Sequence, residues 1–127
     1  MNPLTTEWVE KAEGDYATAE RESRVRRNPN YDAVCFHAQQ MAEKYLKAFL
    51  QEHGIIFPRI HNLIELLELC VPIDATLEFQ RPSLWALNRY AVRYRYPGEW
   101  ADRDEARQAL HVATEFRRFI RARLGLV

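Results

Sequence analysis

Apolar residues recur at the three- and four-residue spacing of an α-helix along most of the chain, and proline or glycine interrupts this pattern at intervals. Only four glycines occur in 127 residues, and no segment alternates between apolar and polar residues as a half-exposed strand does. Helices of this kind are stabilised mainly by packing of their apolar faces, because helix propensity alone does not hold them in water. The sequence therefore predicts an all-α fold, an antiparallel up-and-down four-helix bundle with one additional short helix, as a single domain over residues 1–127.

Capping residues and helix breakers predict where each helix begins and ends. The expected ranges are about 6–26, 31–53, 63–70, 84–96 and 103–124, with one or two further turns between 74 and 80. The expected caps are Thr5 or Thr6 for the first helix, Asn62 for the third, Ser83 for the fourth and Asp102 for the last. Gly54 ends the second helix, and Pro97 disfavours helical geometry beyond Tyr96 in the fourth.

The overall charge and composition exclude several classes of protein. Eighteen basic residues balance eighteen acidic ones, so recognition of a phosphate needs a local cluster of charge rather than the net field. The N-terminus lacks the regions of a signal peptide, and LIELLELCV is too short and too acidic to cross a bilayer. Cys35 and Cys70 lie far apart in apolar helical pattern, which favours reduced core cysteines, and the four histidines lack metal-ligand spacing. We expect a cytoplasmic protein with no metal and no cofactor.

The stretch FHAQQMAEKYLKAFL carries six polar side chains on one predicted helix. A helix turns by about 100° per residue, so His37, Gln40 and Lys44 share an arc of roughly 60° at the border of the apolar face. Side chains at such a border can be held by packing and still reach a ligand, although Lys, Gln and His also occupy it simply to keep their polar ends in water. Gln39 and Glu43 project to the far side of the helix and are expected to face solvent.

Two charged side chains fall on helix faces that are otherwise apolar. Asp15 lies within the apolar stripe of the first helix, and Arg95 falls among the inward-facing residues of the fourth, whereas Arg89 and Arg93 project outward. An unpaired buried charge costs several kcal/mol, so both groups need partners. We expect Asp15 and Arg95, with His37, to form one partly buried polar cluster. The alternative is that Asp15 is solvated at the edge of its stripe and that Arg95 lies beyond the end of its helix.

The stretch RYRYPGEW combines arginines with aromatic rings, since Arg93 and Arg95 alternate with Tyr94 and Tyr96 and are followed by Trp100. Guanidinium groups bind phosphates and aromatic rings stack on nucleotide bases, which is the chemistry of a single-stranded nucleic acid or nucleotide site. Aromatic side chains at a helix end also serve as core or dimer contacts. Both interpretations stay open at this point.

The second helix, the connector after it and the RYRYPGE stretch together resemble the HEPN domain, the higher eukaryote and prokaryote nucleotide-binding family. The family pattern is a histidine, Gln-Gln-x-x-Glu-Lys-x-Leu-Lys-Ala, then Gly, Pro and His, and finally Arg-Tyr-Pro. The matching residues are His37, Gln39, Gln40, Glu43, Lys44, Leu46, Lys47, Ala48, Gly54, Pro58, His61, Arg95, Tyr96 and Pro97. An Asp15-Tyr16 pair on the first helix also fits, so the resemblance spans nearly the whole chain.

The resemblance implies a helical bundle that is usually a homodimer and often acts with a minimal nucleotidyltransferase encoded beside it, in toxin–antitoxin style pairs. It also implies that many members are metal-independent ribonucleases with Arg-x(4–6)-His on the last helices of two subunits. There, a general base and an arginine for the scissile phosphate would be the chemistry. No histidine in this chain has an arginine at that spacing. The nearest approximation is Arg107 and His111, which are separated by three residues and share a helix face.

Three functions follow as alternatives. The favoured one is a module that binds a nucleotide or an RNA phosphate and acts with a nucleotidyltransferase partner. Its expected ligand-binding residues are Asp15, His37, Gln40, Lys44, Arg95 and Tyr96, with Lys44 and Arg95 on phosphates and Tyr96 or Trp100 on the base. The second is a ribonuclease with Arg107 and His111 as catalytic residues at a dimer cleft. The third is an interaction protein without a small ligand, whose charged face binds the partner.

Overall fold

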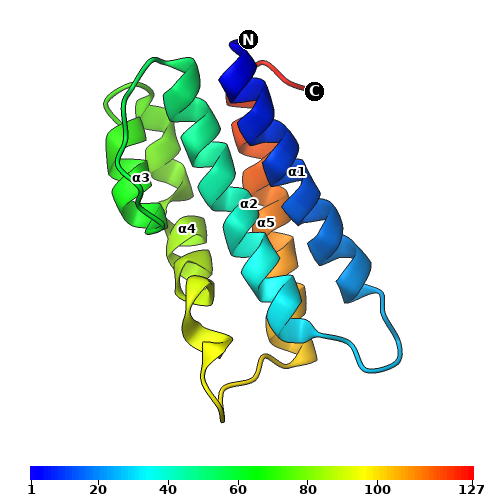
Figure 1. Cartoon of the computed structure of the whole chain (residues 1–127). Helices are drawn as coiled ribbons and strands as arrows, with labels where there is room; N and C mark the ends of the chain where they lie inside the picture. The colour runs from blue at the N-terminus through cyan, green and yellow to red at the C-terminus, as the bar shows by residue number, and fades with distance from the viewer.

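The computed structural model describes residues 1–127 and contains helices but no strands, which confirms the all-α prediction (Figure 1). The α-helices are α1 (Pro3–Ser23), α2 (Tyr31–Glu52), α3 (Leu63–Cys70), α4 (Arg81–Asn88) and α5 (Arg103–Arg123). Three 3₁₀ segments, η1 (Ala75–Gln80), η2 (Arg89–Ala91) and η3 (Arg93–Arg95), flank α4. The bundle thus consists of three long helices and two short ones.

Most predicted helix ends agree with the structure because a side chain caps them. Asn62 accepts hydrogen bonds from the backbone N–H groups of Ile64 and Glu65, at 2.9 and 3.1 Å, and Asp102 accepts one from Glu105 at 2.8 Å. Gly54 follows α2 with a φ of +69°, a conformation that favours glycine.

The start of the first helix was predicted wrongly. Asn2, rather than Thr5 or Thr6, caps α1, and its side chain accepts hydrogen bonds from the N–H groups of Leu4 and Thr5. Pro3 fits the first helical position because no intrahelical partner exists there for a backbone N–H. Thr5 therefore lies inside the helix, and its side chain is buried.

The fourth helix is shorter than predicted. It begins at Arg81, before the expected cap Ser83, and ends at Asn88, well before Tyr96. The Asn88 side chain accepts a hydrogen bond from the N–H of Leu63 at 2.8 Å, and the chain then continues in 3₁₀ turns instead of α-helix. Because the backbone is no longer α-helical, the projection that turned Arg95 inward fails, and Arg95 is exposed.

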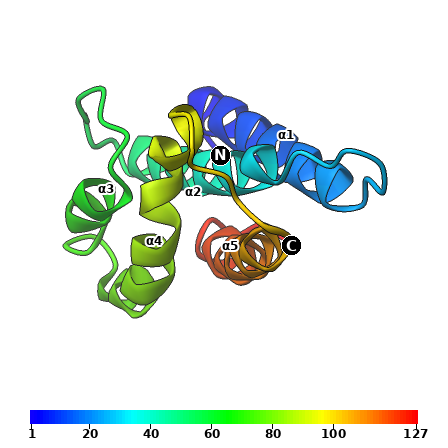
Figure 2. The same cartoon turned by 90° about the horizontal axis from the view of Figure 1, so that it is seen from below.

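The core forms around α2, which lies between α1 and α5 on one side and the α3–α4 pair on the other (Figure 2). A cluster of 27 buried apolar residues fills it, and α2 provides the largest share. Cys35 and Cys70 belong to this core as free thiols, and burial raises the pKa of each to about 12. No helix is long and apolar enough to cross a membrane.

The two ends of the bundle differ in what they contain. Both chain termini lie at one end, so α1 runs antiparallel to α5 (Figure 1). The other end holds the α1–α2 loop, the segment between α4 and α5, and the first turn of α5 (Figures 1 and 2). The hydrogen bond from the N–H of Ala101 to Asp32, at 2.7 Å, joins the second of these segments to the start of α2.

Candidate functional site

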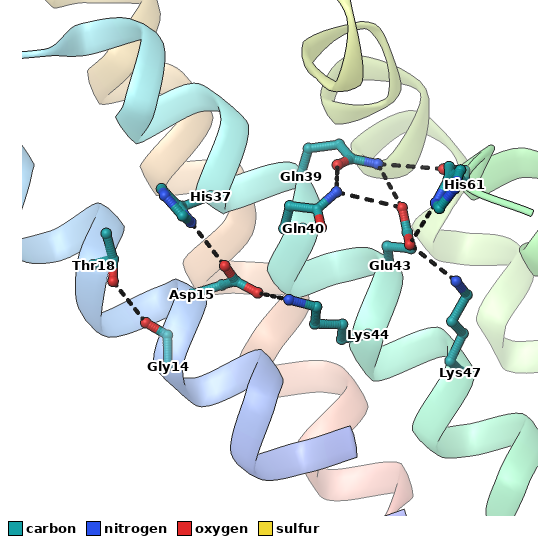
Figure 3. A network of polar contacts seen from close by, with 10 residues as sticks. All are labelled: Gly14, Asp15, Thr18, His37, Gln39, Gln40, Glu43, Lys44, Lys47 and His61. Atoms are coloured by element: carbon teal, nitrogen blue, oxygen red, sulfur yellow. Dashed lines mark hydrogen bonds and ion pairs between the residues drawn. The ribbon is translucent and has the colours of Figure 1, made fainter. Parts of the chain in front are cut away.

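A buried aspartate on α1 connects to two side chains of α2 (Figure 3). Asp15 is 9% exposed; its Oδ1 lies 2.7 Å from Nδ1 of His37, and its Oδ2 lies 2.5 Å from Nζ of Lys44. The His37 and Lys44 side chains remain 29% and 24% exposed, so both reach the surface. We call these three residues the Asp15 cluster. Asp15 makes no ion pair with Arg95, and the predicted pairing of those two is wrong.

The geometry of His37 fixes the role of its two ring nitrogens. A carboxylate can only accept, so Nδ1 carries a proton and donates it to Asp15. This leaves Nε2 as an acceptor in the neutral ring, or as a second donor in the protonated ring. Lys44 neutralises the same carboxylate, so its ammonium is already engaged and its main contribution is to hold Asp15 in place.

A second cluster lies on another side of α2 (Figure 3). Glu43 is 3% exposed, and its Oε2 accepts hydrogen bonds from Nζ of Lys47 and Nδ1 of His61, each at 3.0 Å. The amide of Gln39 donates to the backbone carbonyl of His61 at 3.3 Å, and the amide of Gln40 donates to Oε1 of Gln39 at 2.8 Å. We call these five residues the Glu43 cluster.

The Glu43 cluster overturns the prediction that Gln39 and Glu43 face solvent. Both are buried because the connector before α3 returns along this side of α2 and brings His61 against them. Gln40 belongs to this cluster, although the helical projection grouped it with His37 and Lys44. The projection could not reveal the connector, since it considered one helix alone.

A cavity of about 630 Å³ opens beside His37, between the start of α2 and the segment before α5. Its volume lies in the range of small-molecule sites. Aromatic rings dominate the wall, together with polar groups, and the lining residues are Asn28, Pro29, Asn30, Tyr31, Asp32, Ala33, Phe36, His37, Tyr90, Ala91, Tyr94, Arg95, Trp100 and Ala101. We call it the aromatic cavity. Of the predicted ligand-binding residues, His37 and Arg95 line it; Tyr96 is exposed outside it.

The arginines around the cavity differ in how they are paired. Glu105 forms ion pairs with Arg93 at 3.1 Å and with Arg89 at 3.8 Å, and it accepts a hydrogen bond from the hydroxyl of Tyr94. Burial is the main cause that raises the pKa of Tyr94, and the hydrogen bond to Glu105 raises it further, so the hydroxyl stays protonated. Arg95 has no carboxylate within ion-pair distance, and its charge is available at the mouth of the cavity.

Comparison with known proteins identifies the family and supports the fold. The sequence profile described as HEPN domain matches residues 5–123, which is nearly the whole chain. The chain belongs to the HEPN domain family. A crystal structure of TT1696 from Thermus thermophilus is similar in fold, with a TM-score of 0.77 and 24% sequence identity over 93% of this chain and 96% of that one. A search of curated proteins gave no match.

In this HEPN domain, the candidate catalytic pair lies apart from the aromatic cavity. Arg107 and His111 are both exposed on α5, one helical turn apart, and neither lines that cavity. Neither forms an ion pair within the chain. Within one chain, the catalytic candidates and the Asp15 cluster with its cavity are therefore two separate sets of polar groups.

A third polar cluster joins α1, α2 and α5 and was not found from the sequence. Glu13 binds Arg117 through two hydrogen bonds of 2.6 and 2.8 Å and accepts from the hydroxyl of Tyr45, to which Arg121 also donates at 3.0 Å. Burial opposes ionisation of Glu13, but the hydrogen bonds from Arg117 and Tyr45 lower its pKa below the usual 4.5. Burial and the bond to Glu13 raise the pKa of Tyr45 to about 12.

Several cavity residues were also missed, namely Tyr31, Phe36 and Tyr90. They lie on segments that are far apart in the sequence, and no local pattern links them. The one available signal was the concentration of aromatic residues in YDAVCF and NRYAVRYRYPGEW, which would have singled out both walls of the cavity.

Proposed function

We propose that this HEPN domain binds a nucleotide or an RNA phosphate in the aromatic cavity, with Asp15 and Lys44 positioning His37 beside the ligand. The observation that supports this best is the meeting of His37 and the unpaired Arg95 with several aromatic rings around about 630 Å³. A nucleotide has complementary parts, since its phosphate pairs with a guanidinium and its base stacks on aromatic rings.

Each side chain has a distinct task in this proposal. Arg95 binds the phosphate, because its five donors match phosphate oxygens and no carboxylate competes for them. Trp100 is 78% exposed, and its ring is available for stacking on a base. His37 hydrogen-bonds the ligand through Nε2, while Asp15 holds its ring in one orientation.

Calorimetric titration with nucleoside mono- and triphosphates tests this proposal. We expect saturable binding that Arg95→Gln weakens about tenfold or more, as loss of a charge-assisted hydrogen bond does. Arg59→Gln is the matched control, because Arg59 is also exposed and unpaired but does not line the cavity. The absence of both heat and thermal stabilisation with every nucleotide would count against the proposal.

We further propose that the domain acts as a homodimer with a minimal nucleotidyltransferase partner, as a toxin–antitoxin style pair. The family resemblance supports this, together with two large apolar side chains at the surface near α4. Phe79 and Trp85 are 81% and 70% exposed, a typical feature of protein-binding surfaces. We expect the domain to co-purify with the product of a neighbouring nucleotidyltransferase gene. We expect the Trp85→Ala variant to lose this co-purification. A neighbouring product that never co-purifies would contradict it.

A further inference from the structure

A second cavity lies next to the aromatic cavity, at the end of the bundle away from the termini. It measures about 590 Å³ and is lined by Ser23, Arg24, Val25, Arg26, Tyr31 and Arg103. We call it the arginine cavity. Its lining residues come from the end of α1, the α1–α2 loop and the first residues of α2 and α5. Figure 2 shows the α1–α2 loop and the start of α5 on the side facing the viewer. Tyr31 lines both cavities, so the two are neighbours that share one wall.

Two of the three arginines that line the arginine cavity have no ion-pair partner within the chain. Arg26 and Arg103 form no ion pair, and Arg24 has one partner, Glu20, at 3.6 Å between largely exposed side chains. Such an exposed pair contributes little and competes weakly with a ligand.

Nearby carboxylates have other roles. Glu22 accepts from the N–H of Asn30 at 2.7 Å, Asp32 accepts from that of Ala101 at 2.7 Å, and Asp102 caps α5. Asp104, in the first turn of α5, is an exposed carboxylate without such a contact. None of these carboxylates forms an ion pair with Arg26 or Arg103, so two unpaired guanidinium groups face one hollow.

We propose that the arginine cavity binds a second phosphate of the same ligand, and that this ligand is a single-stranded oligonucleotide rather than a mononucleotide. The inference rests on the proposed function of the aromatic cavity and specifies its ligand class. A single strand alternates phosphates with flat bases. The surface offers the matching order, with Arg95 and Trp100 at one cavity, Tyr31 on the shared wall, and Arg26 with Arg103 at the other.

Binding of a 5′-phosphorylated mononucleotide, dinucleotide and hexaribonucleotide, each with the same base, tests the inference. We expect the dinucleotide and hexanucleotide to bind at least about tenfold more tightly than the mononucleotide. The double variant Arg26→Gln/Arg103→Gln should remove that gain and leave mononucleotide affinity within about twofold of wild type. In this double variant, log affinity for the hexanucleotide should also depend less steeply on log salt. The magnitude of the slope should decrease by about 0.7, which corresponds to one phosphate of a single strand.

The matched control is Arg59→Gln/Arg118→Gln, which removes two exposed arginines that line neither cavity. It should leave all three affinities and the salt slope unchanged. Arg26 lies in a loop and Arg103 is the first residue of α5, where a positive charge opposes the helix dipole, so the double variant should fold. Circular dichroism checks that directly.

The outcomes separate the two proposals. In one outcome, Arg95→Gln weakens mononucleotide binding but longer strands bind no more tightly than the mononucleotide. This would overturn the proposed role of the arginine cavity and leave the proposed function intact. Equal weakening by both double variants would also overturn it, because the effect would then be one of overall charge. If no nucleotide of any length binds, the proposed function fails, and the oligonucleotide inference fails with it.

Discussion

The Asp15 cluster and the Glu43 cluster both depend on α2, yet their surroundings differ. Glu43 and Lys47 are 3% and 6% exposed, and the side chains of Gln39, Gln40 and His61 each hydrogen-bond within the cluster. His37 and Lys44 keep about a quarter of their side-chain surface in solvent, and His37 also lines the aromatic cavity. One side of α2 thus carries polar groups that hold parts of the fold together, and another side carries polar groups that stay accessible to solvent.

The two carboxylates also contact different kinds of partner. In the Glu43 cluster, the carboxylate joins α2 to the connector that leads into α3, so the contacts hold two parts of the fold together. In the Asp15 cluster, the carboxylate orients an imidazole whose second nitrogen forms no hydrogen bond within the chain. Substitutions in the two clusters should therefore affect different measurements.

The largest loss of stability is expected for Glu43→Ala. The change leaves the Lys47 ammonium buried without a carboxylate, which typically costs about 3–5 kcal/mol of unfolding free energy. Urea denaturation measures the loss, with Glu115→Ala as a control, because Glu115 pairs only with the exposed Arg118. A loss of unfolding free energy below about 1 kcal/mol would mean that the Glu43 cluster does not stabilise the packing of the connector on α2.

Asp15→Ala should combine a smaller loss of stability with a loss of ligand binding. Its two partners are partly exposed, so water compensates them, and we expect a cost of about 1–2 kcal/mol. Nucleotide affinity should fall about tenfold, since His37 loses its orientation. Unchanged affinity by calorimetry in the folded variant would separate the Asp15 cluster from the binding site.

Glu13 should make stability depend on acid pH. The pKa of Glu13 is lower in the folded chain than the usual 4.5. Its ionised form therefore contributes fully to the unfolding free energy above pH 4.5, and this contribution is lost as the pH falls through the folded-state pKa. The difference in unfolding free energy between wild type and Glu13→Gln should be about 1 kcal/mol at neutral pH and should shrink as the pH falls below 4.5 and through the folded-state pKa of Glu13. A difference that stays constant with pH would argue against a charge effect.

The smallest effect on stability is expected for His111→Ala. Its side chain is exposed on α5 and lies outside the three polar clusters, so the unfolding free energy should change by less than about 0.5 kcal/mol. The same variant tests the ribonuclease alternative with a labelled RNA. If the wild type cleaves the RNA and the folded His111→Ala variant does not, the result would favour catalysis over simple binding.

Local signals predicted much of the fold. Asn62, Asp102 and Gly54 mark helix ends through capping contacts or a backbone conformation that involve only a few neighbouring residues. These helix ends can therefore be predicted from the local sequence. The end of α4 was different, because Asn88 contacts Leu63, twenty-five residues away, and the following residues adopt 3₁₀ turns.

The site was predictable to a smaller extent for the same reason. His37 and Lys44 were found at the border of an apolar face, and Asp15 was found as a charge within one. The burial of Gln39 and Glu43 depends on a connector that no helical projection includes. The aromatic cavity depends on two distant segments meeting at one end of the bundle.

The hydrogen bond between Asp32 and Ala101 joins residues 69 positions apart, so the aromatic cavity has both walls only when the segment before α5 lies against the start of α2. Closing so long a loop costs conformational entropy, which the packing of α5 offsets. A ligand in the aromatic cavity would add stability only to the chain with both walls in place. Local opening of the segment before α5 would release that ligand while α1 and α2 stay packed.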